Sequence, residues 1–257
     1  MKKFLISDLD GTLLDDWHNI DEKNLEYINI LKEREHGFAI ATGRNVEGVK
    51  FLKDRYKLEC DFFILLNGAL IMDNKFNIIR KKVISSTILK ELVNIAKKSE
   101  LKLFFSDGDK YMYLEELGTV EFCDIKFSPY KSLDHILNNK TPIISASFMG
   151  NKNNIKELNT LVNKLNSFEE IDAFRNQHFI DIAAKGVSKG EGINYIQKNM
   201  EIKSDNIYVI GDSWNDVSML SAYKNSYTFN HTEDKLKKHA TNLVNRVSDC
   251  IKDMIKI

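Results

Sequence analysis

FLISDLDGTLL, residues 4–14, is the stretch that decides the fold. It begins with an apolar run, Phe4 to Ile6, that is typical of a buried strand, and two aspartates, Asp8 and Asp10, follow almost at once. Residues two apart at the end of a strand project to the same side, so both carboxylates are expected to point into one site. Because neighbouring carboxylates repel one another, they call for a cation, and oxygen ligands at this density suit Mg²⁺ better than zinc. The stretch therefore predicts a strand that ends in a magnesium site.

This strand opens an alternating pattern of apolar runs and helical segments. Helical spacing over 21–35 is followed by the apolar run 38–41, then by helical spacing over 46–56 and the wholly apolar run 62–66. Strands that are apolar throughout are typical of parallel sheets covered on both faces. The βαβαβ pattern predicts an α/β fold. Open α/β sheets bind ligands at the carboxyl ends of their strands, which is where the paired aspartates are expected.

The pattern changes in the middle of the chain. From about residue 84 to residue 180 it indicates helices mixed with short strands, and both prolines fall in this part. Helical spacing and a further apolar strand, 207–210, then resume the α/β pattern. The expected domains are a discontinuous core, residues 1–83 and 181–257, and an inserted α+β domain, residues 84–180.

The composition excludes several classes of protein. The chain has 257 residues, and its 37 Lys and Arg residues balance 37 Asp and Glu residues, which gives no electrostatic basis for a general nucleic-acid binder or a polybasic membrane protein. The longest apolar run is far shorter than the roughly 20 residues of a membrane-spanning helix. The apolar start ends at Ser7, too early for the core of a signal peptide. We expect a cytoplasmic protein with a small-molecule partner and neither nucleic acid nor membrane as a partner; the oligomeric state is left open.

Two short polar segments stand at expected helix starts. TGR, residues 42–44, follows the second strand, and the Thr42 hydroxyl and free backbone amides make an anion seat there, although a plain helix cap explains the segment equally well by itself. SKG, residues 188–190, opens a helix, and Lys189 at that place can neutralise a phosphate or keep an aspartate ionised. Taken alone, Lys189 reads as a surface residue, so its assignment depends on the other segments.

A last polar segment, GDSWND at residues 211–216, follows the apolar strand 207–210. Asp212 stands at the strand end, where it can join the metal, and Asp216 stands at a helix start. A capped loop explains one aspartate but not two beside an asparagine at a third strand end. We expect the side chain of Trp214, which lies between these residues, to pack.

The four segments, in this order and spacing, resemble the motifs of the haloacid dehalogenase (HAD) superfamily, and the match covers essentially the whole chain. The insert between the second and third motifs resembles the class II cap of the Cof-like branch. The resemblance implies a Rossmann-like core with a parallel sheet, an inserted α+β cap domain, and hydrolysis of phosphate monoesters through an aspartyl-phosphate. Residues 67–69, NGA, also resemble a segment common in that branch; otherwise they form a turn into the following hairpin.

The resemblance implies a role for each candidate residue. Asp8 is the nucleophile, and Asp10 is the acid that protonates the leaving oxygen and then the base that activates water. The implied metal set is the Asp8 carboxylate, the Asp10 backbone carbonyl and Asp212, with Asp216 in or next to the coordination sphere. The residues implied to bind the phosphoryl group are Thr42, the Gly43 amide, Lys189 and Asn215, with Arg44 completing the second motif.

The function expected from these motifs is that of a Mg²⁺-dependent phosphatase of small phosphorylated metabolites, either sugar phosphates or phosphorylated cofactors. A phosphomutase or phosphotransferase of the same superfamily is the alternative, and a binding module without chemistry is disfavoured because every catalytic position is filled. Within the insert, Phe104, Phe105, Tyr111 and Tyr113 are expected to form one packed face of a sheet. Trp17 and His18, after the first motif, are expected to shield the site.

Overall fold

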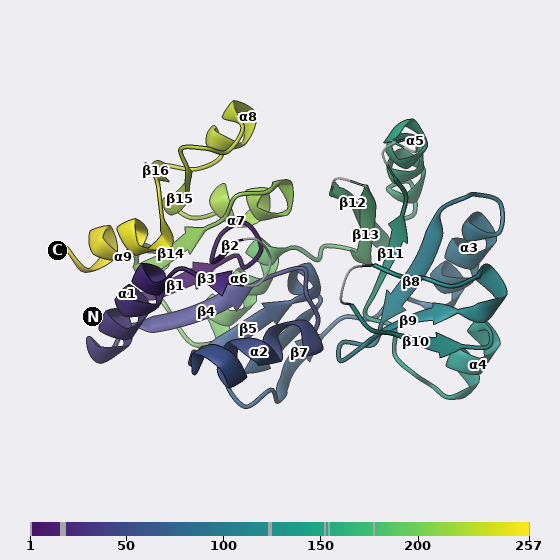
Figure 1. The fold of residues 1–257 in the computed structure, drawn as a ribbon, viewed down its shortest axis with the longest axis horizontal. Helices are drawn as coiled ribbons and strands as arrows, with labels where there is room; N and C mark the ends of the chain where they lie inside the picture. Colours follow the sequence, from purple (N-terminus) through teal and green to yellow (C-terminus); the bar gives the residue numbers. More distant parts are fainter. Residues whose placement is uncertain are drawn as a thin grey trace. The chain divides into compact units, whose positions relative to one another are not determined.

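The computed structural model describes residues 2–15, 19–122, 125–151, 153, 155–176 and 178–256. The chain divides into two compact units, each built around its own sheet (Figure 1). The first unit comprises residues 1–43, 50–79 and 188–257, and the second comprises residues 44–49 and 80–187. Trp17 and His18 lie outside the described residues, so their expected shielding role stays a prediction.

An eight-stranded sheet forms the centre of the first unit, with the order β16-β15-β14-β1-β4-β5-β6-β7. Neighbouring strands from β16 to β5 run parallel, and β6 is antiparallel to β5. The predicted α/β class with a parallel sheet is therefore confirmed. The strands are β1 (Phe4–Ser7), β4 (Gly37–Ala41), β5 (Phe62–Leu65), β6 (Leu70–Asp73), β7 (Ile78–Lys81), β14 (Ile207–Ile210), β15 (Asn225–Phe229) and β16 (Asn242–Val244), with a small hairpin of β2 (Leu14–Asp15) and β3 (Asn19–Ile20) beside them in the sequence.

Apolar side chains on both sides of β1 explain its central place. Phe4 and Ile6 belong to a buried cluster that includes side chains of α6 and α7, whereas Leu5, on the opposite face, is also fully buried. Covering both faces removes the whole strand from water, which is the dominant favourable term in folding. The α-helices of the first unit are α1 (Glu22–Glu33), α6 (Lys189–Asn199), α7 (Val217–Leu220), α8 (Asp234–Lys237) and α9 (Val247–Ile255). Helix α2 (Glu47–Tyr56) has residues in both units.

The second unit holds a six-stranded mixed sheet in the order β10-β9-β8-β11-β13-β12. Only the pairing of β10 with β9 is parallel among its described ladders. Three helices pack their apolar side chains against one face of this sheet, which confirms the expected α+β character. The elements are α3 (Ser86–Ala96), β8 (Lys102–Ser106), β9 (Tyr111–Leu114), β10 (Phe127–Tyr130), α4 (Leu133–Asn138), β11 (Ser145–Met149), α5 (Ile155–Leu165), β12 (Ile171–Asn176) and β13 (Phe179–Ala184).

The sheet of the second unit continues past the domain boundary expected between residues 180 and 181. That position lies inside β13, which pairs with β11 and β12 as far as Ala183 and Ala184. The expected limits of a discontinuous core, residues 1–83 and 181–257, and an inserted domain, residues 84–180, stay a prediction.

The aromatic residues of β8 and β9 do not form one packed face. Phe105 lies in the helix-covered core, whereas Phe104 lies on the other side of the sheet, where its ring meets Tyr111 and Phe127 edge-on at 5.7 and 5.2 Å between ring centroids. The expectation of a single face is therefore wrong for Phe105, because successive residues of a strand point to opposite faces, whereas Phe104 pairs with Tyr113 and shares that face with Tyr111. Among the described residues, no helix has the length and apolar character that crossing a membrane requires.

Candidate active site

Asp8 is the first residue after β1 and is buried. Its amide donates to the carbonyl of Ile210 at the end of β14 (2.9 Å), and Ser7 Oγ donates to the Asp8 carbonyl (2.6 Å). Gly11 then turns the chain with φ 79°, and a Cβ at that position would lie 2.6 Å from Asp212 Oδ2. A side chain does not fit there, so glycine lets the first motif fold back against the end of β14.

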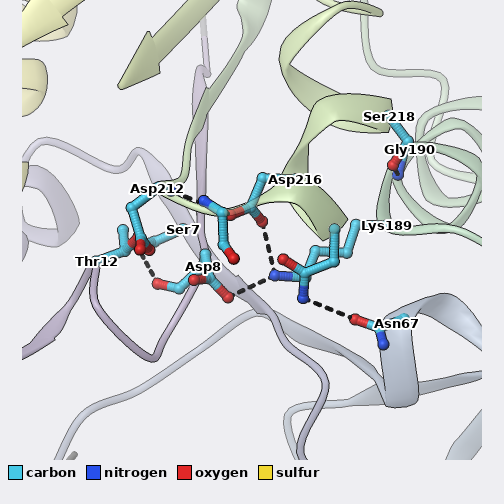
Figure 2. Close-up of polar contacts among 11 residues, drawn as sticks. Ser7, Asp8, Thr12, Asn67, Lys189, Gly190, Asp212, Asp216 and Ser218 are labelled. Atoms are coloured by element: carbon cyan, nitrogen blue, oxygen red, sulfur yellow. Dashed lines mark hydrogen bonds and ion pairs between the residues drawn. The ribbon is translucent and has the colours of Figure 1, made fainter. Parts of the chain in front are cut away.

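Three carboxylates converge at this edge of the sheet (Figure 2). One oxygen each from Asp8, Asp212 and Asp216 lies within 4.8 Å of the other two. Asp212 Oδ1 accepts from Thr12 Oγ1 (2.6 Å), and Asp216 Oδ2 accepts from the amides of Asp212 (3.1 Å) and Ser213 (2.9 Å). These bonds orient two of the three carboxylates: backbone amides of its own loop hold Asp216, and a side chain of the first motif holds Asp212.

Lys189 lies against this cluster and is fully buried. Its Nζ donates to Asp8 Oδ1 (2.5 Å) and to Asp216 Oδ1 (2.6 Å), as the dashed lines in Figure 2 show. Burial lowers the pKa of Lys189, but the two carboxylates outweigh burial and the net shift is upward. The lysine therefore stays charged, and which of its two expected roles it has, neutralising a phosphate or keeping an aspartate ionised, stays a prediction.

The start of α6 is what brings Lys189 inward. Ser188 caps the helix by accepting from the Glu191 amide (3.1 Å). Gly190 packs so closely that an added Cβ would overlap the Ser218 carbonyl, and its amide donates to Ser218 Oγ (3.1 Å). The glycine lets α6 approach the loop of the fourth motif, and the lysine beside it enters the cluster.

The cluster carries more negative charge than Lys189 balances. Burial, followed by repulsion from Asp216, raises the pKa of Asp8 to about 7, although Lys189 opposes the shift. Burial and Asp8 together raise the pKa of Asp212 to about 7, and burial also raises the pKa of Asp216. Three carboxylates and one ammonium sum to a formal charge of −2. Carboxylate oxygens this close together suit a hard divalent cation, so the donor set fits the expected metal.

The predicted phosphoryl-binding residues meet near the same edge. Thr42 is buried, and its carbonyl accepts from the amide of Asn67 (2.9 Å). Gly43 lies beside the Asn67 side chain, because an added Cβ would be 3.4 Å from Asn67 Oδ1. Asn215 Nδ2 donates to that same oxygen (3.1 Å), and Asn215 Oδ1 is buried without a hydrogen-bond partner among the described residues. Thr42, Gly43 and Asn215 are thus connected through Asn67.

Asp10 lies near enough to Asp8 for its charge to raise the pKa of Asp8, whereas the described hydrogen bond of Arg44 lies outside the carboxylate cluster. Asp10 is partly buried and its backbone bridges to Leu14, which closes the turn of the first motif. The Arg44 guanidinium donates to the Gly48 carbonyl (3.2 Å) in the first turn of the following helix, α2, and residue 44 belongs with the second unit. The roles of Asp10 and Arg44 therefore stay predictions.

Trp214 contradicts its expected packing, because half of the residue's surface is exposed (50%). The side chain of Asp216 accepts from the Ser213 amide, and Ser213 in turn caps the Asp216 backbone. This reciprocal box turns Asp216 inward and leaves the intervening Trp214 on the outside, edge-on to the His239 ring at 6.2 Å.

The sequence patterns predict no role for Thr12 and predict a turn at Asn67. The Thr12 hydroxyl contacts a residue 200 positions later, and that contact depends on β1 and β14 being neighbours. The only signal for Asn67 was its resemblance to a common segment. Neither contact is visible from local sequence patterns.

Comparisons with known proteins agree with this arrangement. A family model described as haloacid dehalogenase-like hydrolase matches residues 5–250. A protein of Mycoplasma capricolum is 32% identical over 288 residues, covering 100% of this chain and 99% of its own. The 5-amino-6-(5-phospho-D-ribitylamino)uracil phosphatase of Bacillus subtilis is 22% identical over 259 residues, covering 98% and 96%. A solved structure described as the HAD subclass IIB sugar phosphatase BT4131 matches 100% of both chains with a TM-score of 0.79 at 22% identity, which shows the shared fold.

Proposed function

The chain belongs to the haloacid dehalogenase-like hydrolase family, in its Cof-like branch, and we propose that it is a Mg²⁺-dependent phosphatase that hydrolyses small phosphorylated metabolites through an aspartyl-phosphate. The observation that carries the proposal is the buried cluster of Asp8, Lys189, Asp212 and Asp216 at the carboxyl edge of the sheet. A cluster of this charge has no evident structural use, because burying uncompensated carboxylates opposes folding.

The cation is proposed to be held by the Asp8 carboxylate, the Asp10 backbone carbonyl and Asp212, with Asp216 next to them. When bound, Mg²⁺ supplies positive charge that offsets the repulsion between a carboxylate nucleophile and a phosphate dianion. Thr12 and the amides that bond Asp216 keep two of these carboxylates oriented before the ion arrives. Such preorganisation reduces the rearrangement that binding requires.

Asp8 is the proposed nucleophile. An Asp8 carboxylate oxygen forms a bond to phosphorus while the bond from phosphorus to the ester oxygen breaks, which gives an aspartyl-phosphate and a departing alkoxide. Each pair of like charges about 4 Å apart costs about 4 kcal/mol at an effective dielectric constant of 20. The Lys189 ammonium, 2.5 Å from Asp8 Oδ1, lies where it lowers this cost.

Asp10 is proposed to move the protons. As a carboxylic acid it donates its proton to the departing alkoxide, and as a carboxylate it then takes a proton from the water that attacks the aspartyl-phosphate. The second step breaks the bond between Asp8 and phosphorus and releases inorganic phosphate. An amide at position 10 does neither, because it is not an acid or a base at neutral pH.

Thr42, the Gly43 amide, Lys189 and Asn215 are proposed to bind the phosphoryl oxygens. Thr42 and Gly43 stand at the end of β4, and Asn215 stands in the loop after β14, so donors from two strand ends converge beside Asp8. Backbone amides and uncharged donors bind anions at such positions without the cost of burying further charge. Arg44 is proposed to contribute from the second motif.

The proposed substrates are sugar phosphates or phosphorylated cofactors and their precursors. One relative is described as a sugar phosphatase and another as the phosphatase of a ribityl-uracil phosphate, and both names describe a phosphate on a polyhydroxylated carbon chain. Such metabolites are charged and small, which agrees with the expected cytoplasmic location. The second unit is proposed to be the cap that selects among them.

The test is phosphate release by the purified protein from p-nitrophenyl phosphate and a panel of sugar phosphates, with Mg²⁺ and with EDTA. Activity is expected with Mg²⁺ only, and Asp8→Asn is expected to abolish it. Asp205→Asn is the matched control, because Asp205 is exposed and pairs with Lys224 on the surface. Full activity in Asp8→Asn would refute the nucleophile. A hexose phosphate that is isomerised without release of free phosphate would instead identify a phosphomutase.

A further inference from the structure

The turn at residues 66–68, after β5, has an unusual backbone. Leu66 (φ 49°), Asn67 (φ 54°) and Gly68 (φ 102°) are three successive residues in the left-handed region. Glycine adopts this region readily, but leucine does so at a cost in free energy, and here the leucine is also buried. Surrounding contacts must hold such a conformation, and strain of this kind gathers at functional sites.

The turn touches the second and fourth motifs through Asn67. The Asn67 amide donates to the Thr42 carbonyl (2.9 Å), and the Asn67 side chain lies against Gly43. Asn67 Oδ1 accepts from Asn215 Nδ2 (3.1 Å), and Figure 2 shows the Asn67 side chain directed from its turn toward the cluster. One side chain therefore connects two motifs that are about 170 residues apart in the sequence.

The same turn also packs against the third motif. A Cβ on Gly68 would lie 2.3 Å from the Ser188 carbonyl oxygen, and a Cβ on Gly192 would lie 3.4 Å from Gly68 Cα. The backbone of the turn and the start of α6 are therefore in direct contact, one residue before Lys189. Three of the four motifs meet at residues 66–68, which fixes the position of Asn67 relative to the site.

We propose that Asn67 is a positioning residue that sets the orientation of the Asn215 amide toward the phosphoryl group. An asparagine amide offers N–H donors from one end and an acceptor oxygen from the other. Because Asn67 Oδ1 is an acceptor, it pairs with the Nδ2 end of Asn215 and disfavours the flipped amide, in which two oxygens would face each other. Asn67 uses one N–H of Asn215 and leaves the second for a phosphoryl oxygen.

This inference rests on the proposed function, because it assumes that Asn215 binds phosphate. Without Asn67 the Asn215 amide is free to flip, and the flipped amide presents its oxygen to a phosphate, which repels it. Because the Asn215 amide can still bind phosphate in one of its two orientations, the expected loss of phosphate affinity is smaller than that of a whole hydrogen bond to a charged group, about tenfold at most. The effect requires Asn215, so it should vanish when Asn215 is already removed.

The experiment is a double-mutant cycle with Asn67→Gly and Asn215→Ala. Glycine keeps the left-handed backbone and removes only the side chain, so folding is expected to survive. The readouts are the dissociation constant of inorganic phosphate with Mg²⁺, by calorimetry, and kcat/KM for p-nitrophenyl phosphate. Asn67→Gly is expected to weaken phosphate binding and lower kcat/KM by about 3- to 10-fold, and the double variant is expected to match Asn215→Ala.

The matched control is Asn245→Ala. It breaks another hydrogen bond between asparagine side chains, from Asn230 Nδ2 to Asn245 Oδ1 (2.8 Å), at an exposed place, and it is expected to leave both readouts unchanged.

Unchanged phosphate binding in Asn67→Gly would overturn the inference. So would a loss of affinity, on adding Asn67→Gly to Asn215→Ala, that equals the loss caused by Asn67→Gly alone. Failure of Asn67→Gly to fold would also overturn it, because it would show that the side chain only holds the turn. Failure of the proposed function can be told apart from failure of this inference. It would appear as a wild-type protein without phosphatase activity, whereas phosphate binding by the variants, measured by calorimetry, still tests the role of Asn67.

Discussion

Replacement of Lys189 by methionine removes a buried ammonium and keeps most of its apolar stem. In the structure the ammonium lies 2.5 Å from Asp8 Oδ1 and 2.6 Å from Asp216 Oδ1, with none of the side chain exposed. The variant leaves those two carboxylates, with Asp212 beside them, in a site that water does not reach well. We expect a large loss of stability in the absence of metal.

The expected loss is about 3–5 kcal/mol, the usual cost of breaking a buried ion pair by removal of one partner. The free energy of unfolding of a domain is about 5–15 kcal/mol, so this loss is a substantial fraction of it. For a chain of this size each kcal/mol changes Tm by roughly 2–4 °C, which gives a decrease of roughly 6–20 °C.

The loss should depend on pH with a definite sign. Burial and neighbouring carboxylates raise the folded-state pKa of Asp8 from 3.8 to about 7, and Lys189 opposes that rise, so its removal raises the pKa further. A carboxyl group with a raised pKa binds its proton more tightly in the folded protein than in the unfolded chain. Its destabilising effect is therefore absent below about pH 4, grows as the pH rises from about 4 to 7 in the wild-type protein, and goes on growing above pH 7 in Lys189→Met, where the folded-state pKa is higher still. The stability difference between Lys189→Met and the wild type should therefore be small at pH 5 and larger at pH 8.

The assay is thermal unfolding in EDTA at pH 5 and at pH 8. Lys185→Met is the control, because Lys185 contacts Asp172 at the same 2.6 Å but half of its side chain is exposed (54%). An exposed pair contributes about 0–1 kcal/mol. If Lys189→Met and Lys185→Met lowered Tm equally little at pH 8, the reasoning about burial would be refuted.

Two further predictions follow from the same site. Mg²⁺ should raise Tm more at pH 8 than at pH 5, because protons compete with the ion for Asp8 and Asp212, whose pKa values are raised to about 7. Scanning fluorimetry measures both shifts of Tm, and equal shifts at the two pH values would contradict this prediction. Gly11→Ala should abolish Mg²⁺-dependent phosphate release, because its Cβ would lie 2.6 Å from Asp212 Oδ2 at φ 79°. Gly186→Ala, at φ 72° with nothing within 4 Å of the added Cβ, should keep the activity and lower only the free energy of unfolding, by the roughly 1–2 kcal/mol of left-handed strain, which a lower Tm would report. Equal activities of the two alanine variants would contradict the steric argument.

The sequence was sufficient for the parallel sheet because apolar strands that alternate with helices are local patterns, and the same patterns select the candidate residues, whose roles stay predictions. Each motif stands where an apolar strand ends or a helix begins, and the direction of the strands then brings the motifs to one edge. The exposure of Trp214 was not predictable in this way, because it follows from a reciprocal bond between Ser213 and Asp216. The complete burial of Lys189 depends on how closely Gly190 approaches another loop.

One helix was missed although the sequence contains the pattern that predicts it. Helix α9 (residues 247–255) is not among the expected elements. Its buried residues Val247, Cys250, Ile251 and Met254 nevertheless have the sequence spacing of one helical face. The sequence gives no comparable signal for strand β10, because β10 contains Pro129, and proline is a poor strand former in the interior of a sheet. Proline is tolerated in β10 because this strand lies at the edge of its sheet.

The place of β1 at the centre of its sheet has a consequence for synthesis. β1 pairs with β4 on one side, but its other side pairs with β14, whose residues leave the ribosome about 200 residues later. At about 5–20 residues per second this interval is about 10–40 s. During this interval the ribosome synthesises the whole second unit. One edge of β1 lacks its neighbour β14, and the Asp8 carboxylate lacks Lys189 until residue 189 is made. The cluster of Asp8, Asp212 and Asp216 therefore forms only after the long insertion has emerged and had time to fold.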